Sequence, residues 1–383
     1  MIFKNFLNIK SYKNNKKIKK DFKDLIKNQY PIFESLKPTY KYSYTKKNIL
    51  KYKKFSNIRI IGMGGSILGT EAIYCFLKKK IKKKLTFVNN LNSNADYFHD
   101  KKINLNLIIS KSGNTLETIS NANILIKDRE KNIIITENKN SYLTNLSKKL
   151  NAEVFEHKNY MGGRYSVLSE VGMLPSELMN LDENKFKQFN NLIKNKSFVN
   201  NLVNNVAVTL SLMKSGKYNS IILNYDEQSE SLFKWYQQLI AESLGKKSKG
   251  ILPIVSSMPK DNHSLMQLYL DGPKNSFYTF FNTLENNVVK IKNNKILNSH
   301  KYLRSLSIEK IKQSQMLATE KVFASKKIPY RSFRVSKRSE QSLGELFCFF
   351  ILETILLGRA LNVNPFDQPS VELVKKQTKK ILI

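Results

Sequence analysis

Short β-branched runs alternate with helical patterns along most of the chain, and this alternation limits the possible folds more than any other feature. The runs NIRIIGMG, KLTFVNN, NLIISKSGNT and KNIIITEN each predict a strand, and stretches such as LETISNANILIKD between them predict helices. Strand–helix–strand units form parallel sheets with helices on both faces. We therefore predict an α/β protein with mainly parallel sheets.

The alternation occurs in two rounds. The second round contains the predicted strands SIILNY, ILPIVSS, SFYTFF and KIPYRSFRV and the predicted helix SLFKWYQQLIAESLGK. With 383 residues, the chain is long enough for two or three domains. We expect a Lys-rich helical extension over 1–40, an αβα sandwich domain over 41–185, a second such domain over 186–340, and closing helices over 341–383.

The composition is that of an ordinary globular chain, with 41% hydrophobic and 25% charged residues. No apolar run approaches the roughly 20 residues of a membrane span, and the N-terminus does not match a signal peptide. Cys75 and Cys348 are the only cysteines, which are too few for a disulfide framework, and neither lies near a histidine cluster. We expect a cytoplasmic protein without a membrane partner and without a metal.

Basic residues dominate the charge, since 65 Lys and Arg against 30 Asp and Glu give a net charge of +35. A charge of this size can indicate nucleic-acid binding. Here the lysines are spread through helices and loops, and no nucleic-acid-binding motif accompanies them. We interpret the excess as compositional and expect no specific nucleic-acid partner, although a basic field also attracts anionic substrates.

The stretch IRIIGMGGSILGTEA is typical of a phosphate-binding turn between a strand and a helix. A dinucleotide fingerprint requires a third glycine where Ile67 stands and an acidic residue where Asn89 ends the next strand. A Walker loop requires a lysine before Thr70, which is absent. The remaining interpretation is an anion or sugar site formed by Ser66 and by backbone N–H groups at Gly65.

A second turn of this kind follows the third predicted strand. In IISKSGNTLET, the residues Ser110, Lys111, Ser112 and Thr115 lie between a strand and a helix. Three hydroxyls, one ammonium group and the N-terminal amides of a helix form an anion site that needs no metal. Helix capping alone would require only one of these hydroxyls. The group therefore indicates ligand binding.

These motifs resemble a known family. Ser-x-Ser-Gly-x-Thr is the signature of sugar isomerase (SIS) domains. GMGGS, GGRYSVLSEVG, QQLIAESLGK, DNHSLMQLYLDGP and FDQPSVELVK accompany it in the order found in glucose-6-phosphate isomerases, from about residue 58 to residue 376. The resemblance implies two SIS-type domains, the first binding phosphate. It also implies an enzyme of glycolysis and gluconeogenesis that interconverts glucose 6-phosphate and fructose 6-phosphate through a cis-enediol, without a cofactor.

The resemblance implies roles for single residues as well. Glu242 is expected to move the proton between C1 and C2, with Gln238 one helical turn before it on the same face. Arg164 is expected to face the enediolate oxygens, because a fixed guanidinium stabilises growing negative charge. His263 is expected to open the sugar ring. In the family this histidine comes from the neighbouring subunit, which implies a homodimer.

Two residues near the C-terminus complete the expected site. Lys375 corresponds to a lysine that assists at the ring oxygen, and Gln368 to a residue that binds the phosphate end. The sequence departs from the family at Val374, where glycine is usual, and at Asn114, where many relatives have threonine.

Two alternatives remain open from the sequence. One is a dual phosphoglucose/phosphomannose isomerase, although the Arg164 and His263 motifs argue against it. The other is a noncatalytic SIS-domain sensor of sugar phosphates that binds nucleic acid through its basic surface. A sensor predicts a helix-turn-helix module, which is not visible in the sequence, and leaves Glu242 without a role.

Overall fold

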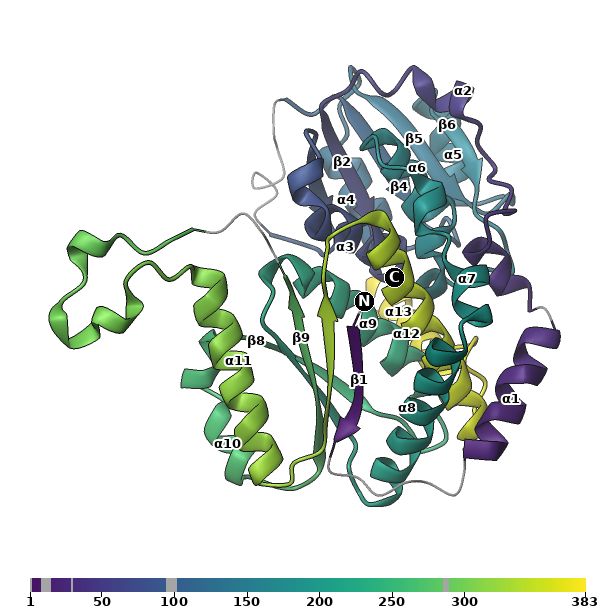
Figure 1. The fold of residues 1–383 in the computed structure, drawn as a ribbon. Helices are drawn as coiled ribbons and strands as arrows, with labels where there is room; N and C mark the ends of the chain where they lie inside the picture. The colour runs from purple at the N-terminus through teal and green to yellow at the C-terminus, as the bar shows by residue number, and fades with distance from the viewer. Residues whose placement is uncertain (1, 8–14, 29, 94–101, 285–288) are drawn as a thin grey trace.

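The computed structural model contains two α/β units, each built on a five-stranded sheet (Figure 1). It describes residues 2–7, 15–28, 30–93, 102–284 and 289–383. The predicted α/β class with mainly parallel sheets is confirmed.

The first sheet has the strand order β3-β2-β4-β5-β6, and all its neighbouring strands are parallel. Its strands are β2 (Asn57–Gly62), β3 (Lys84–Val88), β4 (Leu105–Ile109), β5 (Lys131–Thr136) and β6 (Glu153–Glu156). Most of their aliphatic side chains are buried, as expected for a parallel sheet between helices. The helices of this unit are α2 (Lys46–Leu50), α3 (Leu68–Phe76), α4 (Leu116–Leu125), α5 (Tyr142–Lys149) and α6 (Glu170–Leu178).

The second sheet has the order β1-β10-β9-β7-β8. The strands β7 (Asn219–Asn224), β8 (Leu252–Ser257), β9 (Ser276–Thr283) and β10 (Tyr330–Val335) are parallel, and β1 (Ile2–Leu7) pairs antiparallel with β10. The helices of this unit are α1 (Asn15–Lys27), α7 (Phe189–Lys194), α8 (Lys196–Lys214), α9 (Glu230–Leu244), α10 (Met266–Asp271), α11 (Ile308–Ser325) and α12 (Glu340–Ala360).

Alternating side chains on β9 show how both faces of the second sheet are covered. Tyr278 and Phe280 pack in one apolar cluster with residues of α10 and α11. Phe277 and Phe281 belong to the main core, to which α8, α9 and α12 contribute. Helices therefore cover this sheet on both sides, as the alternation in the sequence predicts (Figure 1).

The N-terminal segment matches the expected helical extension only in part. α1 is helical and packs against α8 and α12, but the chain before it forms β1. The edge of β10 would otherwise expose unpaired backbone N–H and C=O groups, and β1 provides partners for them. The boundaries expected at residues 40, 185 and 340 remain predictions.

The two sheets repeat one strand order, in which the first parallel strand lies between the second and the third. The chain leaves such a strand on one side and returns on the other, and in open α/β sheets ligand sites lie in the crevice outside the carboxyl ends of the first and third strands. We call the crevice between β2 and β4 the first crevice and the crevice between β7 and β9 the second crevice.

The protein's own side chains close the second crevice. Asp226, which follows β7, accepts hydrogen bonds from Ser229 Oγ and from Thr283 Oγ1 (3.2 Å) at the end of β9. Its carboxylate also pairs with Arg338, and the residue is buried. The carboxyl ends of β7 and β9 are thus joined through a buried carboxylate of the protein itself.

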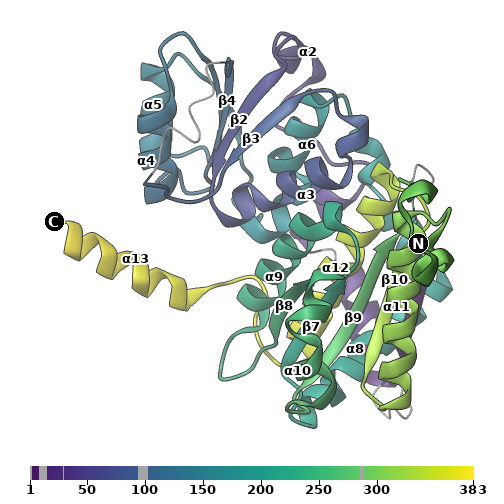
Figure 2. The same cartoon turned by 90° about the vertical axis from the view of Figure 1, so that its left-hand side faces the viewer.

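The two C-terminal helices differ in burial. α12 is buried along most of its length, whereas α13 (Pro369–Leu382) has no buried residue and projects away from both units (Figure 2). Its exposed apolar residues include Val371, Leu373, Val374, Ile381 and Leu382. No helix among the described residues is both long enough and apolar enough for a membrane span.

Candidate active site

The glycine turn after β2 is held against a second loop. Gly64 has a φ of +52°, a left-handed conformation that glycine adopts without strain. A Cβ on Gly65 would lie 2.1 Å from the carbonyl carbon of Gly163, so only glycine permits this approach. Ser66 is nearly buried, and its N–H donates to the Met63 carbonyl at 3.1 Å.

The serine-rich turn after β4 brings its hydroxyl groups together. Ser110 Oγ lies 2.8 Å from Thr115 Oγ1, and the Asn114 N–H donates to Ser112 Oγ at 3.2 Å. α4 begins at Leu116, so the first N–H groups of this helix, which lack intrahelical acceptors, lie next to the hydroxyls. This arrangement suits an anion.

The ammonium group of Lys111 in the same turn already has partners within the protein. Its Nζ donates to the Asn159 carbonyl at 2.8 Å and lies 3.6 Å from Glu137 Oε1. The two turns are neighbours in space, because β2 and β4 pair with Gly62 opposite Ile109. The first crevice therefore has the glycine turn on one side and the serine-rich turn on the other.

Arg164 lies buried near the start of the 3-10 helix η5 (Gly163–Leu168), and all five of its guanidinium N–H donors have acceptors. Nε donates to Ser243 Oγ at 2.8 Å. One terminal nitrogen donates to Glu242 Oε1 and Gln368 Oε1, both at 2.9 Å, and the other donates to the carbonyls of Pro365 (2.7 Å) and Asp367 (3.0 Å). A buried charge is tolerated only with such complete pairing, so this side chain fixes three distant segments together.

Glu242 on α9 has both carboxylate oxygens engaged. Oε1 accepts from Arg164, and Oε2 accepts from Gln238 Nε2 at 2.9 Å. Gln238 Nε2 also lies 2.8 Å from the position that a Cβ on Gly64 would take, which places this amide against the glycine turn. The Glu242 side chain is 22% exposed, so its carboxylate is open to solvent.

Gln368 lies beside Arg164 and not at the serine-rich turn. Its Oε1 accepts from the guanidinium, and no hydrogen bond joins it to residues 110–115 within the described chain. The expected contact of Gln368 with phosphate remains a prediction.

Three supporting residues were not predicted from the sequence. Tyr165 OH lies 2.9 Å from Ser243 Oγ and donates to the Pro365 carbonyl at 3.0 Å, and Trp235 Nε1 donates to the Arg164 carbonyl at 3.1 Å. The single tryptophan, on the same helix as Glu242, was the available signal, because a buried indole N–H needs an acceptor.

His263 and Lys375 are not joined to this cluster within the described chain. His263 is exposed in the 3-10 helix η8 (Lys260–His263) after β8. Lys375 lies on α13, is largely exposed, and pairs with Glu372 at 2.7 Å. Their expected roles remain predictions. In the described ranges, no three His, Cys, Asp or Glu side chains gather in a way that would suit a metal ion.

Lys187 is a buried cation at the far end of η5. Its Nζ donates to the carbonyls of Ser35 and Leu168, the last residue of η5, and lies 5.2 and 5.0 Å from the ring centres of Tyr40 and Tyr42. Burial lowers the pKa of Lys187 to about 7. The segment that begins at Arg164 is therefore anchored at both ends.

A family model described as phosphoglucose isomerase matches residues 10–383. The chain belongs to the phosphoglucose isomerase family. A glucose-6-phosphate isomerase of Methanocaldococcus jannaschii is 34% identical to it over 348 residues, which are 86% of this chain and 86% of that protein.

Solved structures show the same fold at lower identity. A hypothetical protein from Thermus thermophilus matches with a TM-score of 0.82 and 21% identity, over 96% of this chain and 94% of that one. A glucose-6-phosphate isomerase from Chlamydia trachomatis matches with a TM-score of 0.72 and 20% identity, over 88% of this chain and 71% of that one. Both likenesses confirm the predicted architecture.

The close approach of Gly65 to Gly163 predicts different results for two similar substitutions. Gly65→Ala places a methyl group inside the Gly163 backbone and should destabilise the fold by about 1–3 kcal/mol or more. Gly163→Ala is the matched control, because its Cβ would meet no atom closer than 3.8 Å. Urea unfolding of both variants measures the difference, and equal losses of stability would contradict the described packing.

The buried ammonium of Lys187 predicts a pH effect on stability. Its folded pKa of about 7 lies below the ordinary value, so between these values the unfolded chain binds one proton more than the folded chain. The free energy of unfolding should therefore rise with pH above about 7, and below that value the ionisation of Lys187 should no longer change it. Relative to Lys187→Met, the wild type should gain on the order of 1–3 kcal/mol between about pH 6 and about pH 9. Urea unfolding at both pH values tests this, and parallel pH profiles would refute it.

Proposed function

We propose that the chain interconverts glucose 6-phosphate and fructose 6-phosphate as an aldose–ketose isomerase. Its membership of the phosphoglucose isomerase family over residues 10–383 supports this function. The observation that carries it in the structure is the carboxylate of Glu242, held by Arg164 and Gln238 beside the glycine turn of the first crevice.

The phosphate of the substrate binds at the serine-rich turn in this proposal. The hydroxyls of Ser110, Ser112 and Thr115 and the N-terminal amides of α4 are donors that suit its oxygens. Gly65 and Ser66 extend this surface from β2 toward Glu242. Lys111 supplies a positive field, but its pairing near Glu137 weakens that field.

The proton transfer needs one base that reaches C1 and C2. Glu242 takes the proton from one carbon and returns it to the other, and the cis-enediol forms in between. Arg164 stabilises the charge on the enediolate oxygens. Because Arg164 has no spare N–H, an oxygen of the intermediate binds it only by replacing one of its present acceptors, and among these Gln368 and Glu242 share one terminal nitrogen. We therefore propose that Gln368 is a displaceable contact at the reacting end, in place of the expected contact with phosphate.

No observation specifically favours the two alternatives. A sensor role does not explain why the Glu242 carboxylate is held by two donors in a partly exposed position, whereas activity on mannose 6-phosphate would use the same base and is distinguished only by assay. Residence in the cytoplasm remains a prediction.

A homodimer is part of the proposal. His263 is exposed and lies outside the cluster around Arg164, which suits a residue donated to a second copy. The exposed apolar residues of α13 also suit burial against another chain. Lys375 on the same helix would then act from a position fixed only in the assembly.

The Glu242→Gln variant tests the base. It keeps the shape and the oxygen that accepts from Arg164, but its amide cannot take the carbon proton, so turnover should fall at least about 100-fold with normal folding. A coupled assay with fructose 6-phosphate and with mannose 6-phosphate measures it, and Glu230→Gln on the same helix is the control. Unchanged turnover in Glu242→Gln would remove this carboxylate as the base.

Mixing two inactive variants tests the shared site. Glu242→Gln and His263→Asn should each be inactive as homodimers. In a mixed dimer one site combines an intact Glu242 with the partner copy's intact histidine, so an equal mixture that is unfolded and refolded together should recover about a quarter of wild-type activity. Absence of any recovery, with dimers present by gel filtration, would place both residues in a site of one chain.

A further inference from the structure

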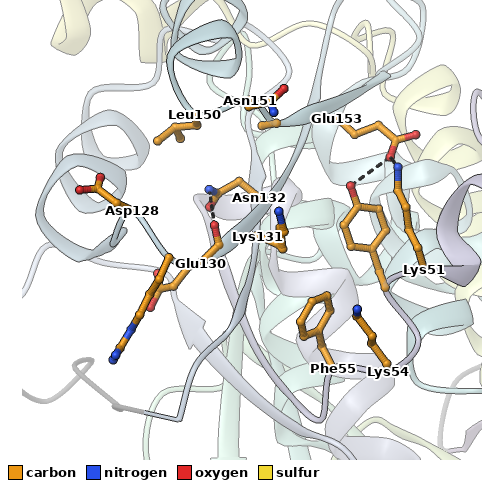
Figure 3. A pocket seen from close by; sticks show the side chains of 13 residues that line it. Lys51, Lys54, Phe55, Asp128, Glu130, Lys131, Asn132, Leu150, Asn151 and Glu153 are labelled. Carbon is orange, nitrogen blue, oxygen red and sulfur yellow. Dashed lines mark hydrogen bonds and ion pairs between the residues drawn. The ribbon is translucent and has the colours of Figure 1, made fainter.

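A cavity of about 630 Å³ lies at the amino ends of β5 and β6, where the loops before these strands meet the segment after α2 (Figure 3). The first crevice lies at the carboxyl ends of β2 and β4, and therefore at the opposite end of the strands of the same parallel sheet. No residue assigned to the active site lines this cavity. Its volume lies in the range of small-molecule sites.

Two of the three carboxylates in the lining are already neutralised within the protein. Glu153 pairs with Lys51 at 2.7 Å and accepts from Tyr52 OH at 3.0 Å, as Figure 3 shows. Glu130 Oε2 accepts from Asn106 Nδ2 at 2.9 Å and lies 3.4 Å from the buried Arg59 guanidinium.

The free charges that remain are mainly positive. Lys54, Arg129 and Lys131 line the cavity, are exposed, and form no ion pair with any residue that the structure describes. Asp128 is the one lining carboxylate without an ion pair in the same described residues. Three cations against one anion favour a negatively charged ligand.

One wall of the cavity is aromatic. The rings of Phe55 and Tyr52 lie 6.5 Å apart at 35°, and the Lys54 ammonium is 5.5 Å from the Phe55 ring centre. Phe55 is only partly buried, so one part of its ring is open to the cavity. A planar group can pack against such a ring, and amides of Asn132 and Asn151 nearby can hydrogen-bond to its edge.

We propose that this cavity binds a nucleotide, with its phosphates near Arg129 and Lys131 and its base against Phe55. The proposal does not depend on the isomerase function, because binding is measured directly.

Isothermal titration with ATP, tripolyphosphate and adenosine tests the proposal. ATP should bind more tightly than tripolyphosphate and more tightly than adenosine. Arg129→Glu combined with Lys131→Glu should weaken ATP at least about tenfold, since each charge-assisted contact is lost. Phe55→Ala should weaken the binding of ATP but leave the affinity for tripolyphosphate unchanged. Circular dichroism and thermal unfolding confirm that the variants fold.

The control is Lys194→Glu combined with Lys196→Glu, which changes the net charge equally at two exposed lysines away from the cavity. This control should retain wild-type affinity for ATP. An equal loss in the control would mean attraction by the overall charge only and would overturn the proposal. Displacement of ATP by saturating fructose 6-phosphate would place ATP in the first crevice, and equal affinity for tripolyphosphate and ATP would remove the base-binding role of Phe55. Either result also overturns it.

Discussion

The buried guanidinium of Arg164 is the interaction on which the site depends. It binds acceptors from α9 and from the segment between α12 and α13, while its own backbone lies against the glycine turn of the first unit. Each of these elements comes from a different part of the sequence. A buried cation without partners would cost several kcal/mol, so the segments are held in register by the need to satisfy it.

A second buried basic side chain, Lys187, holds the C-terminal end of η5. Lys187 donates to the last carbonyl of this segment and lies near the rings of Tyr40 and Tyr42, so the arginine segment has a buried basic side chain at each end. Catalytic groups need positions fixed to within about an ångström, and a short irregular segment does not provide this by itself. The fully paired Arg164 guanidinium and the buried Lys187 amine together hold this irregular loop in place at both ends.

The sequence predicted the parts of the site that depend on local pattern. The turns at Ser66 and Ser110 follow strands, as their glycines and hydroxyls indicate, and the spacing of Gln238 and Glu242 places both on one helical face. Residues whose position depends on distant pairing were not predictable in this way. The contact of Gln368 with Arg164 crosses most of the chain, and β1 becomes a strand only because β10 offers an open edge. The projection of α13 likewise depends on what packs against it, which no local pattern encodes.

The carboxylate that closes the second crevice has a consequence for how the two halves respond to substrate. Asp226 is held by two hydroxyls and a guanidinium, much as the first crevice offers hydroxyls and an ammonium to a phosphate. The Asp226 carboxylate is present at every substrate concentration and loses no translational freedom when it binds. A sugar phosphate that binds from solution loses this freedom. If the first unit binds a sugar phosphate as proposed, its order depends on substrate concentration, whereas the internal contacts of Asp226 hold the second unit at every concentration.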